Sequence, residues 1–422
     1  MGDSAQQGSL AIPDRGAERP GQLNLAGKRV LFVSNGHGED LNASLVLKAL
    51  VQEFPAVKVA ALPLVGEGNA YRRLDVPLIT PTRSFPSGGI FYNNSIDLVK
   101  DLRSGLLGLA LQQIQAARSH RYEFDWVFAA GDIVPLAIAR LTGLPYSAFI
   151  VSTSSYYEGR LNLPLLTAPL LRSSRCQQLF TRDDYTAKDL QQQGFTRAIF
   201  AGYPIMDVLT PTGKDLQRQA DRSLIALLPG SRIPEACQNF GLQLALCEFL
   251  AEQMPVQICA ALVPSFTEAE LQAVASQHNW QYQGHGRLMK VKNNQEIWVE
   301  CHWDAFADIL HQCDLAIGMA GTAVEQAVGL GKPVIQIPGS GPQFTYAFAE
   351  AQMRLLGSSV QTIGTKAATP EILQQAADRV IQTLKDLPYL QACAKNGQER
   401  VGFTGGSVGI ARHLVTAIRQ FS

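Results

Sequence analysis

The amino-acid sequence predicts an α/β protein made of two doubly wound domains. Short apolar runs of strand length alternate with stretches of helical spacing along nearly the whole chain. Several of these runs end in a glycine-containing turn, which is typical of parallel strands buried on both faces of a sheet. The chain has 422 residues, which exceeds a single ordinary core, so we expect two domains.

The composition indicates a well-packed globular protein without a dominant charge. Hydrophobic residues make up 46% of the chain and charged residues 17%, and the formal net charge is zero. The net charge of the molecule therefore gives no general electrostatic attraction to nucleic acid or to an acidic membrane. The seven cysteines form no Cys-x-x-Cys pair, and we interpret them as reduced core thiols of a cytosolic protein, not as a zinc or disulfide framework. No run reaches the roughly 18 apolar residues of a membrane-spanning helix, so we expect a soluble or peripheral protein.

Turn-rich and polar stretches divide the chain. Residues 1–27 are mostly polar and predict a flexible tail. The first domain covers 28–206, and turn residues followed by a polar segment predict a linker over 207–223. The second domain covers 224–403, and 404–422 contain a last helix.

The first domain begins with a strand over Arg29–Asn35 and a helix over Leu41–Phe54, separated by the glycine-rich turn Gly36–Asp40. The turn matches neither the dinucleotide-binding fingerprint nor a Walker A loop. In doubly wound sheets it lies at the edge where ligands bind. We therefore interpret His37 as a general base, with a solvated loop residue as the alternative, and Asp40 as a helix N-cap.

Asp132 follows another apolar strand, Asp125–Ala129, and precedes a helix. It therefore lies at the same sheet edge as His37 and is a second candidate for the general base, with a purely structural helix N-cap as the alternative.

Leu106–Leu111 and Leu161–Leu171 are apolar segments near arginines. Each is either part of the core or a surface segment that touches lipid. The other predicted elements of this half are strands at 57–65, 146–152 and 178–181 and a helix at 98–117.

The strongest motif starts at the apolar strand Leu224–Leu228, which Pro229 and Gly230 break before Ser231 and Arg232. A helix follows, with an apolar stripe at 240, 244, 247 and 251. Glycine lets the backbone approach a ligand, a helix N-terminus attracts anions, and the arginine fork binds phosphate. The alternative is an ordinary turn with a solvated arginine.

A second turn of this kind follows the strand at 314–318. Thr322 and Glu325 have the spacing of a capping box. Alternatively, the N–H groups of Gly321 and Thr322 face a phosphate while Glu325 binds a ribose, and the presence of two such turns favours this second interpretation. Gln343, in the next loop, is a candidate hydrogen-bond partner for sugar hydroxyls. The other predicted elements are strands at 256–263, 295–301 and 334–337 and helices at 268–276, 303–311, 370–384, 388–400 and 407–420.

With these motifs, the chain resembles lipid-A-disaccharide synthase and its related bacterial proteins over most of residues 28–420. The most specific motif is LLPGSR at 227–232, accompanied by AGYP at 201–204 and SNGHGED at 34–40. The AGT element at 320–322 with Glu325 is also found in the glycosyltransferase that adds N-acetylglucosamine to the lipid-linked peptidoglycan precursor. Glu325 lies three residues after Thr322, as in that enzyme, whereas the synthase spacing is four.

The resemblance implies the GT-B architecture, in which two Rossmann-like domains face a cleft and the last helix crosses back onto the first domain. It also implies roles for individual residues. Arg232 matches the arginine that binds the diphosphate, and Asp132 falls in the region of an essential aspartate. The implied nucleotide-sugar site is Gly230, Ser231, Arg232, Gly321, Thr322, Glu325 and Gln343, and the implied acceptor-side loop is Gly36, Gly38 and Glu39.

The function implied is a glycosyltransferase that moves an N-acylglucosamine-type sugar from a UDP-sugar to a lipid or lipid-linked acceptor, as in lipid A biosynthesis. It would act in the cytoplasm or on the cytoplasmic face of the inner membrane. No Asp-x-Asp pair follows a strand, so we expect neither a metal nor a cofactor, and no nucleic-acid partner. Two alternatives are a non-hydrolysing UDP-sugar 2-epimerase and a catalytically inactive nucleotide-sugar-binding protein.

Overall fold

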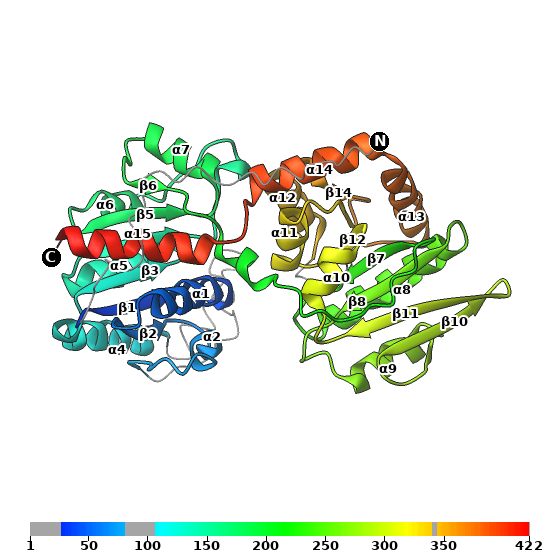
Figure 1. Ribbon diagram of the computed structural model, residues 1–422, viewed down its shortest axis with the longest axis horizontal. Helices are drawn as coiled ribbons and strands as arrows, with labels where there is room; N and C mark the ends of the chain where they lie inside the picture. Colours follow the sequence, from blue (N-terminus) through cyan, green and yellow to red (C-terminus); the bar gives the residue numbers. More distant parts are fainter. Residues whose placement is uncertain (1–26, 81–105, 340–343, 422) are drawn as a thin grey trace, which may run out of the picture.

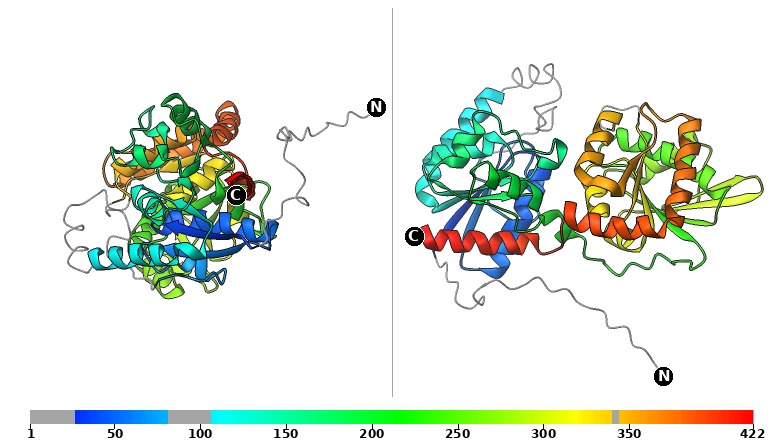
Figure 2. Two further views of the ribbon diagram at one scale, coloured as in Figure 1. Left: turned by 90° about the vertical axis from the view of Figure 1, so that its left-hand side faces the viewer. Right: turned by 90° about the horizontal axis from the view of Figure 1, so that it is seen from above.

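The computed structural model describes residues 27–80, 106–339 and 344–421, and only the backbone of 106–111. Two α/β lobes lie side by side, each built on its own sheet (Figures 1 and 2). The strands of the first sheet come from residues 29–199, and those of the second come from 223–362. The predicted two-sheet α/β fold is confirmed.

The described part of the first sheet has six parallel strands in the order β2-β1-β3-β4-β5-β6. Helices cover both faces, and for this reason its strands are apolar at consecutive positions. Val30 and Phe32 belong to a different hydrophobic cluster from Leu31 and Val33, on opposite faces of the sheet. The strands are β1 (Arg29–Ser34), β2 (Lys58–Pro63), β3 (Trp126–Ala130), β4 (Tyr146–Ile150), β5 (Cys176–Thr181) and β6 (Ala198–Ile199).

The helices of the first lobe pack on these two faces. Helix α1 shares one cluster with the C-terminal helix, while α4, α5 and α6 share the other. The predicted helix at 98–117 is observed from residue 106 onward, and its earlier part lies outside the described residues. The helices are α1 (His37–Glu53), α2 (Asn69–Arg72), α4 (Leu106–Ser119), α5 (Ile133–Thr142), α6 (Thr167–Arg172) and α7 (Asp184–Gln192), with short 3-10 turns η2 (His120–Glu123), η3 (Ser155–Tyr157) and η4 (Pro204–Val208).

The second sheet has eight strands within the described residues, in the order β14-β13-β12-β7-β8-β11-β10-β9. Strand β10 runs antiparallel to both β9 and β11, and the other neighbouring strands of this sheet are parallel. The sequence did not predict β9, β10 and β14. The strands β9 and β14 have only two and three residues, and β10 has basic residues at three of its six positions, with only Leu288 buried. The strands are β7 (Ser223–Leu228), β8 (Val256–Ala261), β9 (Gln281–Tyr282), β10 (Arg287–Lys292), β11 (Gln295–His302), β12 (Leu315–Gly318), β13 (Val334–Gln336) and β14 (Val360–Thr362).

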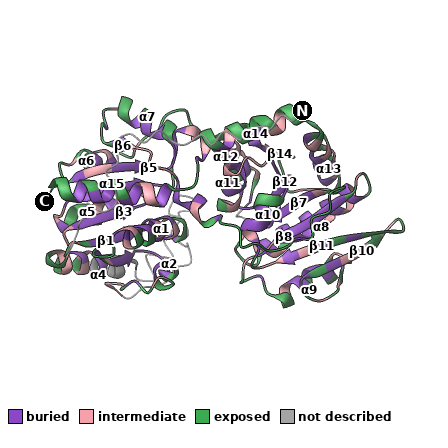
Figure 3. Ribbon diagram, in the orientation of Figure 1, coloured by how far each residue is buried: buried purple, intermediate pink, exposed green. Residues whose placement is uncertain are grey.

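Helices also cover both faces of the second sheet. The predicted stripe of Phe240, Leu244, Cys247 and Ala251 is buried. The central strands that these helices cover are also largely buried (Figure 3). Helices α8, α9 and α13 share one hydrophobic cluster, whereas α10, α11 and α12 pack on the opposite face. The helices are α8 (Glu235–Ala251), α9 (Glu268–Gln277), α10 (Phe306–Gln312), α11 (Thr322–Gly329), α12 (Tyr346–Leu356), α13 (Pro370–Lys385) and α14 (Leu387–Arg400), with the 3-10 turn η5 (Gly357–Ser359).

The last helix, α15 (Gly406–Phe421), returns to the first lobe and packs along α1 (Figures 1 and 2). Its start lies against the Ala201–Pro204 motif, where a Cβ on Gly202 would be 2.5 Å from the Cα of Gly406. Only glycine permits this approach, and Gly202 also has a positive φ of 102°. Asp207 accepts the backbone N–H of Ser407 at 2.7 Å. The predicted crossing of the last helix is therefore confirmed.

Candidate active site

The loop between β7 and α8 presents the predicted phosphate-binding residues to solvent. Gly230 has a φ of 105°, and an added Cβ would lie 3.2 Å from the carbonyl oxygen of Met319. Ser231 and Arg232 are exposed, and the Arg232 guanidinium bonds no other described residue. Helix α8 begins three residues later, at Glu235. An exposed, unengaged arginine before a helix N-terminus suits an anionic ligand.

The second predicted loop, between β12 and α11, lies directly beside the first. The buried amide of Asn239 donates to the carbonyl of Pro229 at 3.0 Å and to that of Met319 at 3.4 Å. Gly321 is the N-cap of α11, and Thr322 makes no capping hydrogen bond. The capping-box alternative is therefore wrong. The structure brings Gly230 and Gly321 onto two adjacent, cross-linked loops.

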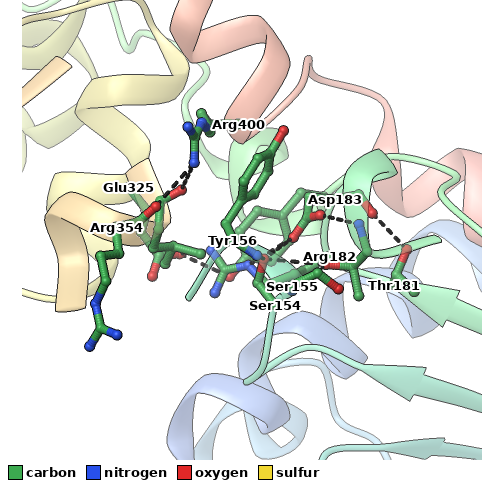
Figure 4. Close-up of polar contacts among 12 residues, drawn as sticks. Ser154, Ser155, Tyr156, Thr181, Arg182, Asp183, Glu325, Arg354 and Arg400 are labelled. Carbon is green, nitrogen blue, oxygen red and sulfur yellow. Dashed lines mark hydrogen bonds and ion pairs between the residues drawn. The ribbon is translucent and has the colours of Figure 1, made fainter. Parts of the chain in front are cut away.

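Glu325, the predicted ribose ligand, is bonded to the first lobe. Its Oε2 accepts from Nη2 of Arg182 at 2.9 Å (Figure 4). The same oxygen accepts from the Tyr203 hydroxyl at 3.0 Å. The side chain is only 13% exposed, and that of Arg182 only 3%. No described residue bonds the other oxygen, Oε1. Because Arg182 follows β5 and Glu325 follows β12, the carboxyl edges of the two sheets meet here.

Arg182 is held in place from several sides. Its guanidinium carbon lies 4.9 Å from the centre of the Tyr203 ring, and its Nε lies 4.0 Å from Asp183. Asp183 is fixed in turn by the hydroxyl of Ser154 at 2.7 Å. Burial opposes the charged form, but the Glu325 carboxylate raises the pKa of Arg182 above its usual range. Arg182 thus remains a buried cation.

Sequence analysis did not identify Arg182. One local signal was available, because a charged residue stands immediately after the apolar strand at 178–181, at the ligand-binding edge. Its partner Glu325 lies far away in sequence, so the pairing itself had no local signal.

On the first lobe, a polar cluster gathers after β1, β3 and β4. Oδ1 of Asp132 accepts from the Asn35 amide at 2.8 Å and from the backbone N–H of Val134 at 2.9 Å. Asp132 is therefore an N-cap, and it also takes part in this cluster. Glu39 accepts the hydroxyl of Ser152. Burial raises the pKa of Glu39, and the nearby charge of Asp132 raises it further.

His37 makes no direct contact with the residues of this cluster. It is exposed, and an added Cβ on Gly66, in the loop after β2, would lie 3.4 Å from its Cε1. Because β1 separates β2 from β3, His37 and Asp132 lie on opposite sides of the end of β1. Of the acceptor-side loop, Gly36 is the N-cap of α1, and Gly38 is exposed in its first turn.

The prediction for Asp40 was wrong. Helix α1 begins at His37, so Asp40 lies inside it, where its backbone N–H donates to the carbonyl of Gly36 at 2.8 Å. Its side chain is 3% exposed and accepts the Ser34 hydroxyl at 2.6 Å. Ser34 also lies 2.6 Å from the hydroxyl of Tyr71. Burial raises the pKa of Asp40 to about 7.

This raised pKa makes a testable prediction about stability. From about pH 4 to 7 the unfolded chain loses the Asp40 proton while the folded chain keeps it, so Asp40 lowers stability as pH rises. The Asp40→Asn variant has no carboxyl group at this position, so its stability should not fall in this way. The difference in free energy of unfolding, variant minus wild type, should therefore increase by up to ~4 kcal/mol between about pH 4 and pH 7. Urea denaturation at several pH values measures the difference. The exposed Asp221→Asn variant is the control, and a pH-independent difference for Asp40→Asn contradicts the prediction.

The remaining predicted residues are placed as follows. Gln343 lies outside the described residues, as do the side chains of Leu106–Leu111. Within Leu161–Leu171 both terminal leucines are buried, whereas Leu165 and Leu166 are 92% and 72% exposed. Among the described residues, no helix combines the length and apolar character needed to cross a membrane.

Comparison with solved structures identifies the architecture. The chain is similar to UDP-GlcNAc 2-epimerase from Neisseria meningitidis bound to UDP-GlcNAc, with a TM-score of 0.51 and 13% identity over 93% of this chain and 100% of that one. It is also similar to MurG from Acinetobacter baumannii, with a TM-score of 0.56 and 17% identity over 93% and 99%. The fold is GT-B.

A third similar structure is the spinosyn rhamnosyltransferase SpnG complexed with thymidine diphosphate, with a TM-score of 0.56 and 15% identity over 92% of this chain and 99% of that one. The sequence matches no protein-family model and no curated protein. At these identities the similarity establishes the GT-B fold alone, and function has to be argued from the site.

Proposed function

We propose that this protein is a glycosyltransferase that moves an N-acylglucosamine-type sugar from a UDP-sugar to a lipid or lipid-linked acceptor. The observation that carries the proposal is the pair of cross-linked glycine loops at Gly230 and Gly321, beside Arg232, whose guanidinium bonds no other described residue. Two helix N-termini and a guanidinium make a suitable site for a diphosphate. The sequence resemblance to lipid-A-disaccharide synthase supports the choice of sugar and acceptor.

The surroundings of Glu325 support a ribose site. Both bonds to the first lobe use Oε2, so a ribose hydroxyl can donate to Oε1 while Arg182 and Tyr203 keep their contacts. The carboxylate is then held in place before the nucleotide binds, which lowers the entropic cost of binding.

In the proposed reaction, an acceptor hydroxyl attacks the anomeric carbon as the bond from that carbon to the diphosphate oxygen breaks. The hydroxyl proton passes to a base on the first lobe, and UDP leaves. Arg232 and the helix N-termini stabilise its growing negative charge, without a metal ion. The candidate bases are His37 and Asp132. Glu39 is a second carboxyl group beside Asp132, and burial raises its pKa.

Mass spectrometry of lipid extracts incubated with the protein and UDP-sugars tests the proposal. We expect a lipid product whose mass increases by one N-acylhexosamine, together with free UDP. Asp132→Asn and His37→Gln variants then identify the base, because only loss of the base should abolish the product while UDP binding persists. If no lipid gains a sugar in extracts from several bacterial membranes, the proposed acceptor class is wrong.

One observation favours a second candidate, a non-hydrolysing UDP-sugar 2-epimerase, because the same fold is found in the Neisseria enzyme. An epimerase needs no acceptor. Incubation with UDP-GlcNAc alone, followed by NMR of the sugar, distinguishes the two, since an epimerase yields the C2 epimer and a transferase leaves the donor intact. UDP binding without either reaction would instead favour an inactive binding protein.

A further inference from the structure

A cysteine, a glutamate and a histidine converge on one face of the second sheet, away from the residues discussed above. Cys259 lies on β8, and Glu300 and His302 lie on β11. In the parallel register Glu300 pairs with Cys259, and residues two apart on a strand share a face. Accordingly, one ligand-type atom from each residue lies within 4.8 Å of the other two.

The histidine of this cluster has an unsatisfied nitrogen. Nε2 of His302 is buried and has no hydrogen-bond partner among the described residues. Its nearest carboxylate oxygen, Oε2 of Glu300, is 4.0 Å away, which is too far for a hydrogen bond. A buried ring nitrogen without a partner is costly. Since Cys259 is a fully buried free thiol, the three side chains have strong ligand atoms and few competing bonds.

We propose that Cys259, Glu300 and His302 bind a zinc ion. Thiolate, imidazole and carboxylate together form a ligand set typical of Zn²⁺, and a water molecule can fill the fourth tetrahedral position. Zinc–ligand bonds of about 2.0–2.3 Å place tetrahedral ligand atoms roughly 3.3–3.8 Å apart. Small side-chain rotations bring the three atoms from their present spacing to that range.

The charges around the cluster are compatible with a cation. Arg287 lies 3.7 Å from Oε1 of Glu300, which leaves Oε2 for the metal. Lys214 is bonded to Asp304 at 3.0 Å, and Arg218 to Asp314 at 2.6 Å. On binding, the Cys259 thiol releases its proton to solvent, so the thiolate and the Glu300 carboxylate neutralise the two charges of the ion.

The position of the cluster indicates a structural role. The segment that joins the two sheets crosses the same face of β8, where the Gln257 amide donates to the carbonyl of Leu216 at 2.7 Å. Four residues earlier in this segment, the hydroxyl of Thr212 donates to Asp308 of α10 at 2.9 Å. A zinc ion that joins β8 to β11 would therefore stabilise the part of the sheet that this connecting segment contacts.

The sequence predicted Cys259 to be a reduced core thiol, because the chain has no Cys-x-x-Cys pair and Cys259 lies within an apolar strand. The site requires two strands that are paired in the fold but separated in sequence, so a search for local metal-binding motifs does not find it.

Cobalt binding to the chelator-treated, full-length protein tests the proposal. We expect one equivalent of Co²⁺ with ligand-field bands of a tetrahedral site and a thiolate-to-cobalt charge-transfer band, and displacement by Zn²⁺ should remove both. Cys259→Ser should abolish the charge-transfer band. His302→Gln and Glu300→Gln should each weaken binding at least ~10-fold. Zinc should raise the Tm of the wild type but not that of His302→Gln.

Matched controls are Cys237→Ser, on the helix covering the opposite sheet face, and the exposed His285→Gln. Both should bind cobalt like the wild type. Binding without a charge-transfer band, or unchanged binding in His302→Gln, would overturn the proposal. If Cys259→Ser fails to fold, the His302 and Glu300 variants still decide the question. No sugar transfer is measured, so the outcome is independent of the proposed function.

Discussion

Replacing Arg232 with alanine is expected to lower the turnover number of glycosyl transfer by about 10²–10³-fold. The negative charge on the departing diphosphate grows as the glycosidic bond breaks, so a guanidinium beside it stabilises the transition state more than the ground state. Because Arg232 is exposed and bonds no other described residue, its removal should leave the fold and the Tm unchanged. Steady-state kinetics with the UDP-sugar and the acceptor measure the effect.

Arg222 provides the matched control, because it is also exposed and precedes the same strand, β7, at the opposite end. Arg222→Ala should retain wild-type turnover. Arg232→Lys keeps the charge but loses the planar fork, so we expect an intermediate loss. Turnover within twofold of wild type in Arg232→Ala would contradict both the role of this arginine and the proposed diphosphate site.

The local structure that the sequence predicted correctly is the structure formed by consecutive residues. Gly230, Ser231 and Arg232 follow a strand whose apolar run is continuous because helices cover both faces of its sheet. The helix after them shows its buried stripe at regular spacing. The same argument placed Asp132 at the end of β3, where it caps α5.

Asp40 shows where a local pattern misleads. Two glycines in Gly36–Asp40 predicted a turn, but only Gly36 needs the positive φ, and the chain is already helical from His37 onward. A glycine in the first turn of a long helix costs only about 1 kcal/mol, which packing of α1 on the sheet outweighs. Asp40 is consequently carried into the core, a position that charged side chains rarely occupy.

No local sequence pattern predicts the bond between Arg182 and Glu325. It joins residues after β5 and β12, two strands in different sheets, and exists only because the lobes meet at those edges. The hydrophobic cluster that runs from the first lobe through Ile205 and Met206 into the second maintains this arrangement. Contacts of this kind depend on the relative placement of two domains, which the pattern of apolar residues within each one does not encode.

Replacing Glu325 with alanine is expected to lower the free energy of unfolding by about 3–5 kcal/mol, because Arg182 would remain buried without its main partner. Asp183, at 4.0 Å, offsets part of the loss, so the lower end of this range is expected. Glu325→Gln keeps an oxygen that accepts from Arg182 and Tyr203 and should cost less. Urea denaturation followed by both circular dichroism and tryptophan fluorescence measures the change, since the two lobes can unfold separately.

A double-mutant cycle separates the ion pair from the loss of packing. Arg182→Met removes the buried charge while keeping an apolar chain, so combining it with Glu325→Ala should cost clearly less than the sum of the single variants, with a coupling energy of about 2–3 kcal/mol. Additive losses would mean that the pair does not stabilise the junction between the sheets.

The Glu325→Gln variant isolates the role of this residue in binding. It largely keeps the junction between the sheets but presents a neutral group to the ribose. It should therefore bind UDP more weakly than wild type while unfolding at nearly the wild-type urea concentration.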